Sequence, residues 1–393
     1  MRRIGVEERR ARLGRRHHLA AGAGTDPTSV ARDVVALHST DPSSVYLAVA
    51  ARMRDAEVAA IERALYEERT LIRMLGMRRT VFVVPVELAA VVKESSTRAV
   101  AARLRRGLVQ HLAEAGATGD ADPGEWLAEL EAATHRALQA RGEAMATELA
   151  EDVPGLRTTL LLAEGKKYQA EVRINNRVLG LMAADGLIVR GRPRGSWISS
   201  QYRWSPIEAW LPAGLPAWST ADAQVELVRR WLAAYGPGTA ADLKWWTGWT
   251  AGEVKRALAA IGPAEVELDG GGTGYVLPDD LGPVEPTGPW VALLPALDPT
   301  VMGWAGRDWY LGDHGPALFD GSGNPGPTVW VDGRIAGGWA QRADGEVVYR
   351  LLEDVGSEAG AAVAAAAARL EKWMGEVRVV PRFRTPLERE LTS

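Results

Sequence analysis

Residues 35–53 read VALHSTDPSSVYLAVAARM, and here a run of polar side chains separates two apolar segments. The polar run consists of His38, Ser39, Thr40 and Asp41. Aspartate is a favoured N-cap and proline fits the first position of a helix, so Asp41-Pro42 predicts a helix over 42–53. The same Asp-Pro pattern predicts a helix over 27–39 ahead of it. The sequence therefore predicts a corner between two helices, with polar groups placed at the corner.

His38 lies on the buried arc of the first of these helices, between Val34 and Val35 at 100° per residue. Two interpretations fit such a histidine: a core residue whose ring nitrogens bind backbone carbonyls, or a reactive group. The Thr40 hydroxyl and the Asp41 carboxylate can join His38 in holding and polarising a water molecule. The negative end of the preceding helix would favour a protonated His38. Asp41 is equally explained as an N-cap, so the residues alone leave both interpretations open.

The composition excludes several kinds of chemistry. The 393 residues predict two to four domains, and the absence of cysteine excludes disulfides, thiolate metal sites and thiol nucleophiles. The six histidines are scattered and no nucleotide-binding glycine motif is present, so we expect neither a metal nor a cofactor. No stretch is long enough to cross a bilayer, and the basic start lacks a signal-peptide core. We therefore expect a cytoplasmic protein.

The net charge of −4 hides a gradient along the chain. Residues 1–110 carry 20 basic and 12 acidic side chains, whereas residues 218–393 carry 15 and 24. Within the middle of the chain, residues 157–206 carry 9 basic and 3 acidic side chains. Binding to a polyanion depends on local charge rather than on the overall balance. The basic regions therefore indicate either a nucleic-acid surface or an ordinary solvated one, and charge alone favours neither.

The order of predicted elements repeats along the chain, because helices are followed each time by a two-stranded hairpin. These hairpins are predicted over 71–85, 186–204 and 264–278. Three helices and a hairpin are typical of a winged-helix unit. The C-terminal part has short strands between Gly and Asp turns and then a helix over 357–374, which predicts a small antiparallel β-barrel with a C-terminal helix. The predicted fold class is therefore α+β, with three tandem winged-helix modules ahead of that barrel. The predicted bounds are 1–110 with the polar corner, 111–213 with a basic wing, 214–283, and 284–393.

The hairpin of the second module, VRGRPRGSWISSQYRW, carries four arginines and no acidic residue. Such a wing typically lies along a phosphate backbone, with the helix predicted over 168–185 facing the groove. The residues expected to bind DNA are Arg190, Arg192, Arg194 and Arg203 of the wing, Lys166, Lys167, Arg173 and Arg177 before it, and Trp304 and Arg307 in a later loop. A merely solvated wing is the alternative, since arginine is common throughout this chain.

Taken together, these features resemble the winged-helix DNA glycosylases of the AlkZ and YcaQ type. Members place a Gln-x-Gln or Gln-x-Asp triplet at the end of an early helix, ahead of an apolar helix with a Tyr-Leu-like step. LHSTDPSSVYLAVAARM matches that frame with His38-Ser39-Thr40 at the triplet, and LLPALDPTVMGW with GPTVWVDGRIAGGW resembles the family's C-terminal part. The resemblance covers roughly residues 25–355. Both polar positions differ, so either the chain uses His38 and Thr40 for the same task or its activity has drifted.

The resemblance implies excision of N7- or N3-alkylated purines from double-stranded DNA by hydrolysis of the N-glycosidic bond. It extends to bulky or crosslinking natural-product adducts, and hence to base excision repair and antibiotic self-resistance. In this interpretation His38 orients or deprotonates water, Thr40 binds that water, and Asp41 adds negative potential near the sugar. We expect a monofunctional enzyme that acts as a monomer.

Two alternatives keep DNA binding without the reaction: a winged-helix regulator and an adduct-sequestering protein. Three different modules and a barrel in one chain argue against a regulator, which commonly pairs one winged helix with one sensor domain. Only a glycosylase leaves alkali-labile abasic sites, so that product separates the three classes.

Overall fold

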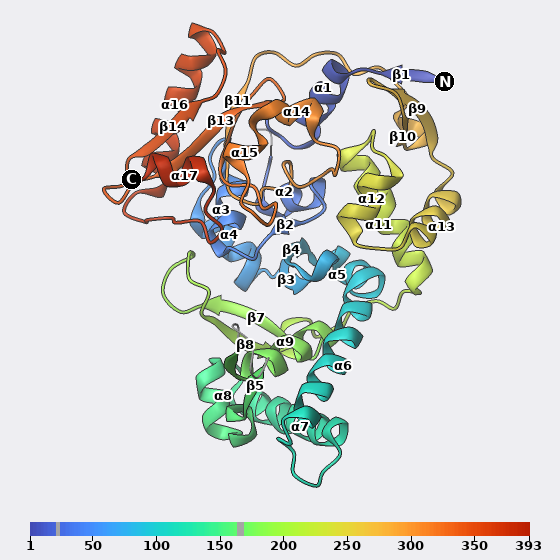
Figure 1. Ribbon diagram of the computed structural model, residues 1–393, viewed down its shortest axis with the longest axis vertical. Coiled ribbons are helices and arrows are strands. Elements are labelled where there is room, and N and C mark those ends of the chain that lie inside the picture. Colours follow the sequence, from blue (N-terminus) through green and yellow to red (C-terminus); the bar gives the residue numbers. More distant parts are fainter. Residues whose placement is uncertain (21–23, 163–168) are drawn as a thin grey trace.

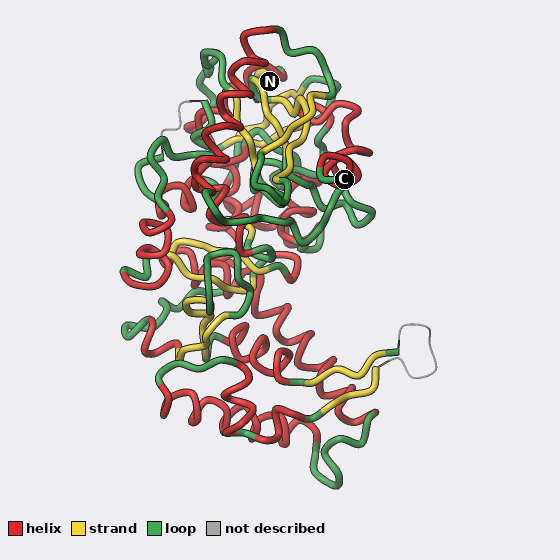
Figure 2. The backbone as a smooth tube through the Cα atoms, turned by 90° about the vertical axis from the view of Figure 1, so that its left-hand side faces the viewer, coloured by secondary structure: helices red, strands yellow, loops and turns green. Residues whose placement is uncertain are grey.

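The computed structural model describes residues 1–20, 24–162 and 169–393 as an α+β chain with several small sheets (Figure 1). Seen from the side, the chain forms an elongated, curved body from which one hairpin of the lower part projects (Figure 2). No helix among the described residues has the length and apolar character needed to cross a membrane.

The polar corner lies in a three-stranded antiparallel sheet with the strand order β2-β4-β3. Its elements are α2 (Pro27–Asp33), β2 (Leu37–His38), α3 (Pro42–Ala50), α4 (Val58–Glu62), η1 (Arg63–Glu67), β3 (Leu71–Leu75), η2 (Met77–Arg79) and β4 (Val81–Pro85). The predicted start of α3 and the predicted hairpin of β3 and β4 are confirmed.

The helix predicted over 27–39 is wrong in its second half, because α2 ends at Asp33. Val35 has a left-handed backbone with φ of 66°, a conformation that a β-branched residue does not adopt inside a helix. Beyond this turn, Leu37 pairs with Val83 and His38 pairs with Phe82. Strand pairing with β4, a segment distant in sequence, therefore decides the structure around His38.

The second module has its own apolar core and sits below the polar corner in Figure 1. The chain reaches it from the first module through α5 (Val86–Val92), η3 (Lys93–Thr97) and α6 (Arg98–Glu114), of which α5 packs in the core around the polar corner. The further elements are α7 (Pro123–Arg141), α8 (Ala146–Asp152), η4 (Pro154–Arg157), β5 (Thr159–Leu162), β6 (Ala170–Arg173), α9 (Asn175–Asp185), β7 (Ile188–Pro193), β8 (Tyr202–Pro206) and α10 (Ile207–Trp210). The predicted helix over 168–185 begins only at Asn175, because residues 170–173 pair with β5. The β7–β8 hairpin is confirmed. Lys166 and Lys167 lie outside the described residues.

The third module shows the predicted order of three helices and a hairpin. Its elements are α11 (Thr220–Tyr235), α12 (Ala240–Thr247), α13 (Ala251–Ile261), β9 (Ala264–Leu268), β10 (Thr273–Val276) and η5 (Pro278–Asp280). The N-terminal strand β1 (Arg2–Ile4), followed by α1 (Val6–Arg16), adds a parallel strand to β9, which the sequence did not indicate. The winged-helix assignment of the three modules stays a prediction.

The predicted C-terminal barrel is wrong, because the sheet there is open. Its elements are β11 (Val291–Leu294), α14 (Asp308–Leu311), η6 (Gly312–His314), α15 (Gly315–Leu318), β12 (Thr328–Val331), β13 (Arg334–Gln341), β14 (Val347–Leu351), α16 (Ser357–Met374) and α17 (Pro386–Leu391). In the described residues the strand order is β11-β12-β13-β14, with no pairing that joins the two edges. Four strands are too few to close around a core, and α16 packs against β11 and β14 instead.

One continuous apolar core joins the polar corner, the third module and the C-terminal sheet. At its centre the side chains of Arg52 and Asp298 are fully buried and form a two-pronged ion pair, with Nη2–Oδ1 and Nη1–Oδ2 distances of 2.7 and 2.9 Å. The segment after α3 is thereby fixed to the segment after β11, which holds the polar corner in place.

Candidate active site

The strand at the corner gives the three polar residues different surroundings. Strand β2 ends at His38, and the Ser39 N–H still donates to the Val81 carbonyl of β4 at 2.8 Å before the chain bends at Thr40 into α3. His38 is buried, with 7% of its surface exposed, and its ring meets the edge of Phe82 at a centroid distance of 5.4 Å. Thr40 is partly exposed. The corner thus places a buried imidazole two residues ahead of a partly exposed threonine.

His38 is neutral, which corrects the expectation of a protonated ring. Burial lowers its pKa from 6.5 to about 3, and the nearby Arg78 guanidinium acts in the same direction. The helix end that was expected to favour the charged form is absent, because α2 stops at Asp33. The Thr40 backbone N–H donates to Nδ1 of His38 at 3.4 Å. With Nδ1 accepting, the single proton of the neutral ring lies on Nε2, which is then a hydrogen-bond donor.

Asp41 is the N-cap of α3 and is buried. Its Oδ1 accepts the Ser43 N–H at 3.0 Å and the Ser43 hydroxyl at 2.7 Å. Its Oδ2 accepts the Arg382 N–H at 3.1 Å, which ties the corner to the C-terminal segment. Both carboxylate oxygens are thus engaged, and this supports the cap interpretation over a direct role in chemistry.

The buried Arg73 binds the residue that follows β2 through a side-chain hydrogen bond. Arg73 on β3 donates from Nε to the Ser39 hydroxyl at 2.7 Å and from Nη1 to the Tyr66 hydroxyl at 3.2 Å. Its guanidinium also stacks on the Tyr202 ring at 4.5 Å. The middle residue of the triplet is therefore anchored to β3. Sequence reasoning missed Arg73, although a charged residue inside the apolar strand LIRML was the available signal.

Two further arginines surround the partly exposed ring of Trp245, near His38. The Arg78 guanidinium lies 4.0 Å from the Trp245 ring centroid and that of Arg307 lies 4.7 Å from it. Arg307 also stacks on Phe319 at 5.0 Å. This arrangement supports the expected binding role of Arg307, whereas Arg78 was not singled out from the sequence. Arg78 therefore brings positive charge close to His38.

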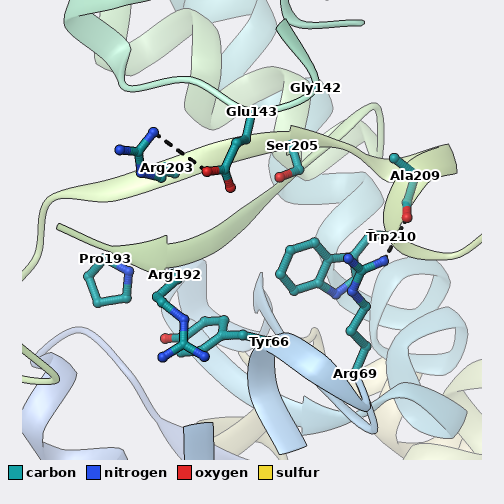
Figure 3. A pocket seen from close by; sticks show the side chains of 10 residues that line it. All are labelled: Tyr66, Arg69, Gly142, Glu143, Arg192, Pro193, Arg203, Ser205, Ala209 and Trp210. Carbon is teal, nitrogen blue, oxygen red and sulfur yellow. Dashed lines mark hydrogen bonds and ion pairs between the residues drawn. The ribbon is translucent and has the colours of Figure 1, made fainter. Parts of the chain in front are cut away.

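The arginines of the β7–β8 hairpin are mostly engaged within the protein. Arg192 forms ion pairs with Glu62 at 2.5 Å and Glu67 at 3.0 Å, and Arg203 pairs with Glu143 at 3.6 Å. These carboxylates belong to other segments of the chain. The β7–β8 hairpin contains no acidic residue itself, but the fold brings carboxylates to two of its arginines. Figure 3 shows Arg192, Arg203 and Glu143 at a pocket that is also lined by Tyr66, Arg69 and Trp210. The pocket has a volume of about 350 Å³, and its lining includes neither His38 nor Thr40.

The remaining predicted binding residues have varied positions. Arg190 lies over the Trp204 ring at 4.7 Å, and Arg194 is exposed at the end of the hairpin. Arg173 is exposed on β6, and Arg177 contacts His111 through Nη1 and Nδ1 at 3.3 Å. Trp304 is 3% exposed and donates from Nε1 to the Tyr235 carbonyl, so it is a core residue rather than a probing one. No cluster of metal-binding side chains occurs among the described residues.

A neutral imidazole close to a positively charged arginine, next to a partly exposed threonine, is a combination that can serve an enzyme with an anionic substrate. The chain matches the family described as DNA glycosylase AlkZ-like over residues 31–373, and it belongs to that family. The family assignment supports a DNA glycosylase, a hydrolase whose substrate is DNA.

Among solved structures, the chain is similar to the DNA glycosylase AlkZ of Streptomyces sahachiroi, with a TM-score of 0.73 and 19% identity. The likeness covers 96% of this chain and 99% of that chain. At this identity it shows the shared fold. A comparison with curated proteins found no match.

Proposed function

We propose that the protein excises N7- or N3-alkylated purines from double-stranded DNA, with His38 and Thr40 acting on the attacking water. The observation that carries the proposal is the buried, neutral imidazole of His38 beside the partly exposed Thr40, in a chain that belongs to a DNA glycosylase family. Bulky or crosslinking natural-product adducts, and with them a role in self-resistance, are part of the proposal. The enzyme would be cytoplasmic, monomeric and monofunctional.

The leaving group determines how much catalysis is needed. An N7-alkylated purine is already cationic, so it departs as a neutral base without a strong general acid. The protein must then stabilise a cationic sugar and direct water to its anomeric carbon. The Nε2–H of His38 would donate to the oxygen of this water, and the Thr40 hydroxyl oxygen would accept a hydrogen bond from it. The proton that the water loses on attack would pass to solvent. This role needs a neutral ring, since a protonated His38 would repel the developing positive charge.

DNA binding is assigned to the predicted basic residues that the structure leaves accessible. Arg173, Arg177, Arg190, Arg194 and Arg307 are the members of that set that are exposed or partly exposed and form no ion pair with a carboxylate among the described residues. Arg192 and Arg203 would have to exchange their present partners for phosphates. A base extruded from the duplex would reach the water held at the corner.

The deciding experiment is incubation with a duplex that carries one N7-methylguanine, followed by alkali treatment and gel electrophoresis. A glycosylase yields strand cleavage at the lesion only after alkali. A regulator or a sequestering protein leaves the strand intact, which would overturn the proposal. Cleavage without alkali would instead contradict monofunctional action.

The residue assignment is tested with His38→Ala and Thr40→Val. Loss of a positioned catalytic group typically lowers a rate by about 10²–10⁴-fold, so the His38→Ala excision rate should fall by that factor while DNA affinity changes little. The matched control is His314→Ala, because His314 is a partly buried histidine of the C-terminal part that contacts Glu353. If His38→Ala and His314→Ala retain similar rates, the assignment of His38 is wrong.

A further inference from the structure

The guanidinium groups of Arg78 and Arg307 both lie against the ring of Trp245. Among the residues that the structure describes, neither arginine forms an ion pair with a carboxylate. Burial, together with the neighbouring Arg307, lowers the pKa of Arg78 to about 10, so the Arg78 guanidinium is still charged at neutral pH. The Nε atom of Arg78 is buried and has no hydrogen-bond partner in the protein. Two cations are thus held together without a counter-charge.

The backbone holds Arg78 firmly in this position. Arg78 has a left-handed φ of 51° and Arg79 one of 61°, conformations that cost energy for residues other than glycine. The Arg78 side chain crosses Gly248, where an added Cβ would lie 3.1 Å from its Cγ. Arg307 is fixed by the bond from its Nε to the Trp304 carbonyl at 3.0 Å. The two guanidinium groups are therefore positioned before any ligand arrives.

Two fully buried arginines of this chain have acidic partners, whereas the buried Arg73 is bonded to hydroxyl groups and forms no ion pair among the described residues. Arg52 pairs with Asp298, and Arg12 pairs with Glu8 and Asp280. Buried charges are normally paired, because removing a lone charge from water is costly. An unpaired pair of cations beside the candidate catalytic residue is consistent with an anion supplied from outside. The neighbouring Gly248, Ala305 and Gly306 are exposed and small, so a polymer backbone can approach closely.

We propose that Arg78 and Arg307 bind one phosphodiester of the lesion-bearing strand and so fix the adjacent deoxyribose against His38. This inference rests on the proposed function, because it identifies the anion as DNA. Arginine donors match phosphate oxygens in geometry, and the charge-assisted bonds replace the missing counter-charge. Arg78 is thereby a substrate-binding residue in addition to those expected from the sequence.

The test combines protein variants with single neutral phosphates. The affinity of wild-type protein and of the double variant Arg78→Gln/Arg307→Gln is measured for a set of duplexes. Each duplex carries a tetrahydrofuran abasic analogue and one methylphosphonate, which removes the charge of a single phosphate at a different position around the analogue. Wild-type affinity should fall on the order of tenfold at one position near the analogue, as expected for a lost charge-assisted bond. The double variant should bind the duplex without a methylphosphonate more weakly than wild type, by a similar factor. A methylphosphonate at the sensitive position should change the affinity of the double variant by less than about twofold.

Two controls separate binding from structure. Arg342→Gln removes an exposed arginine of the C-terminal sheet that already pairs with Glu346, and it should behave as wild type. Arg307→Gln alone, at a partly exposed loop position, repeats the test if the double variant unfolds. The inference is overturned if no single methylphosphonate weakens wild-type binding, or if both variants stay as sensitive as wild type. Because the analogue has no base to excise, this result does not depend on catalysis.

Discussion

The neutral state of His38 predicts a measurable loss of stability in acid. The variant His38→Gln keeps a hydrogen-bonding side chain at this position but has no group that titrates there. In the native protein the pKa of His38 falls from 6.5 to about 3 because the ring is buried and close to Arg78. The unfolded chain has no such burial, so its histidine binds a proton near pH 6.5.

The sign and size follow from proton binding. Between these two pKa values the unfolded state binds more protons than the native state, so the free energy of unfolding falls as the pH falls. The dependence is about 1.4 kcal/mol per pH unit for one proton, and the whole shift corresponds to on the order of 5 kcal/mol. This stability is fully present above about pH 6.5 and is lost progressively toward about pH 3.

The assay is urea denaturation of wild type and His38→Gln at several pH values between about 4.5 and about 7. The difference in unfolding free energy between the two proteins should change by about 2–3 kcal/mol across this range, with wild type losing more. His17, which is also buried with a lowered pKa, is present in both proteins and cancels in the difference. Parallel pH curves would show that the native imidazole is not held neutral, and the reasoning would fail.

Three further results are expected. If neutral His38 orients the water, the single-turnover excision rate should be flat from about pH 5 to about pH 8, and a midpoint near 6.5 would contradict its low pKa. Asp41→Ala should lower the free energy of unfolding by about 2–4 kcal/mol, because it removes the helix cap and leaves the Arg382 N–H unpaired. The folded variant should keep its excision activity in the alkali assay. A folded but inactive variant would assign Asp41 a direct role. Arg52→Met should cost about 3–5 kcal/mol in urea denaturation because Asp298 stays buried without its partner, and a loss below about 1 kcal/mol would show that water reaches that carboxylate.

Local signals in the sequence determined where many elements begin. Asp41-Pro42 and Asp122-Pro123 start α3 and α7 because the capping carboxylate and the fixed proline φ act on the adjacent backbone. Alternating apolar residues determined the β3–β4 hairpin for the same local reason. The closeness of His38 and Thr40 is likewise local, because only one residue separates them in the chain.

Pairing between distant segments decided what the sequence left open or gave wrongly. His38 is in a strand because β4 pairs with it, and Ala170–Arg173 forms β6 because β5 lies beside it. The C-terminal sheet stays open because a helix covers it. Such partners are separated by turns and loops, so no local periodicity identifies them.

The chemistry of the candidate site likewise depends partly on the local sequence and partly on the tertiary structure. The sequence by itself placed an imidazole and a hydroxyl at a break ahead of α3. Only the tertiary structure decided that the imidazole is neutral, since its pKa depends on burial among residues from other strands and on Arg78. It likewise decided which arginines are neutralised, by bringing Glu62 to Arg192 and no carboxylate to Arg307 among the described residues. Charge and burial are properties of three-dimensional neighbours, and the order of residues does not encode them directly.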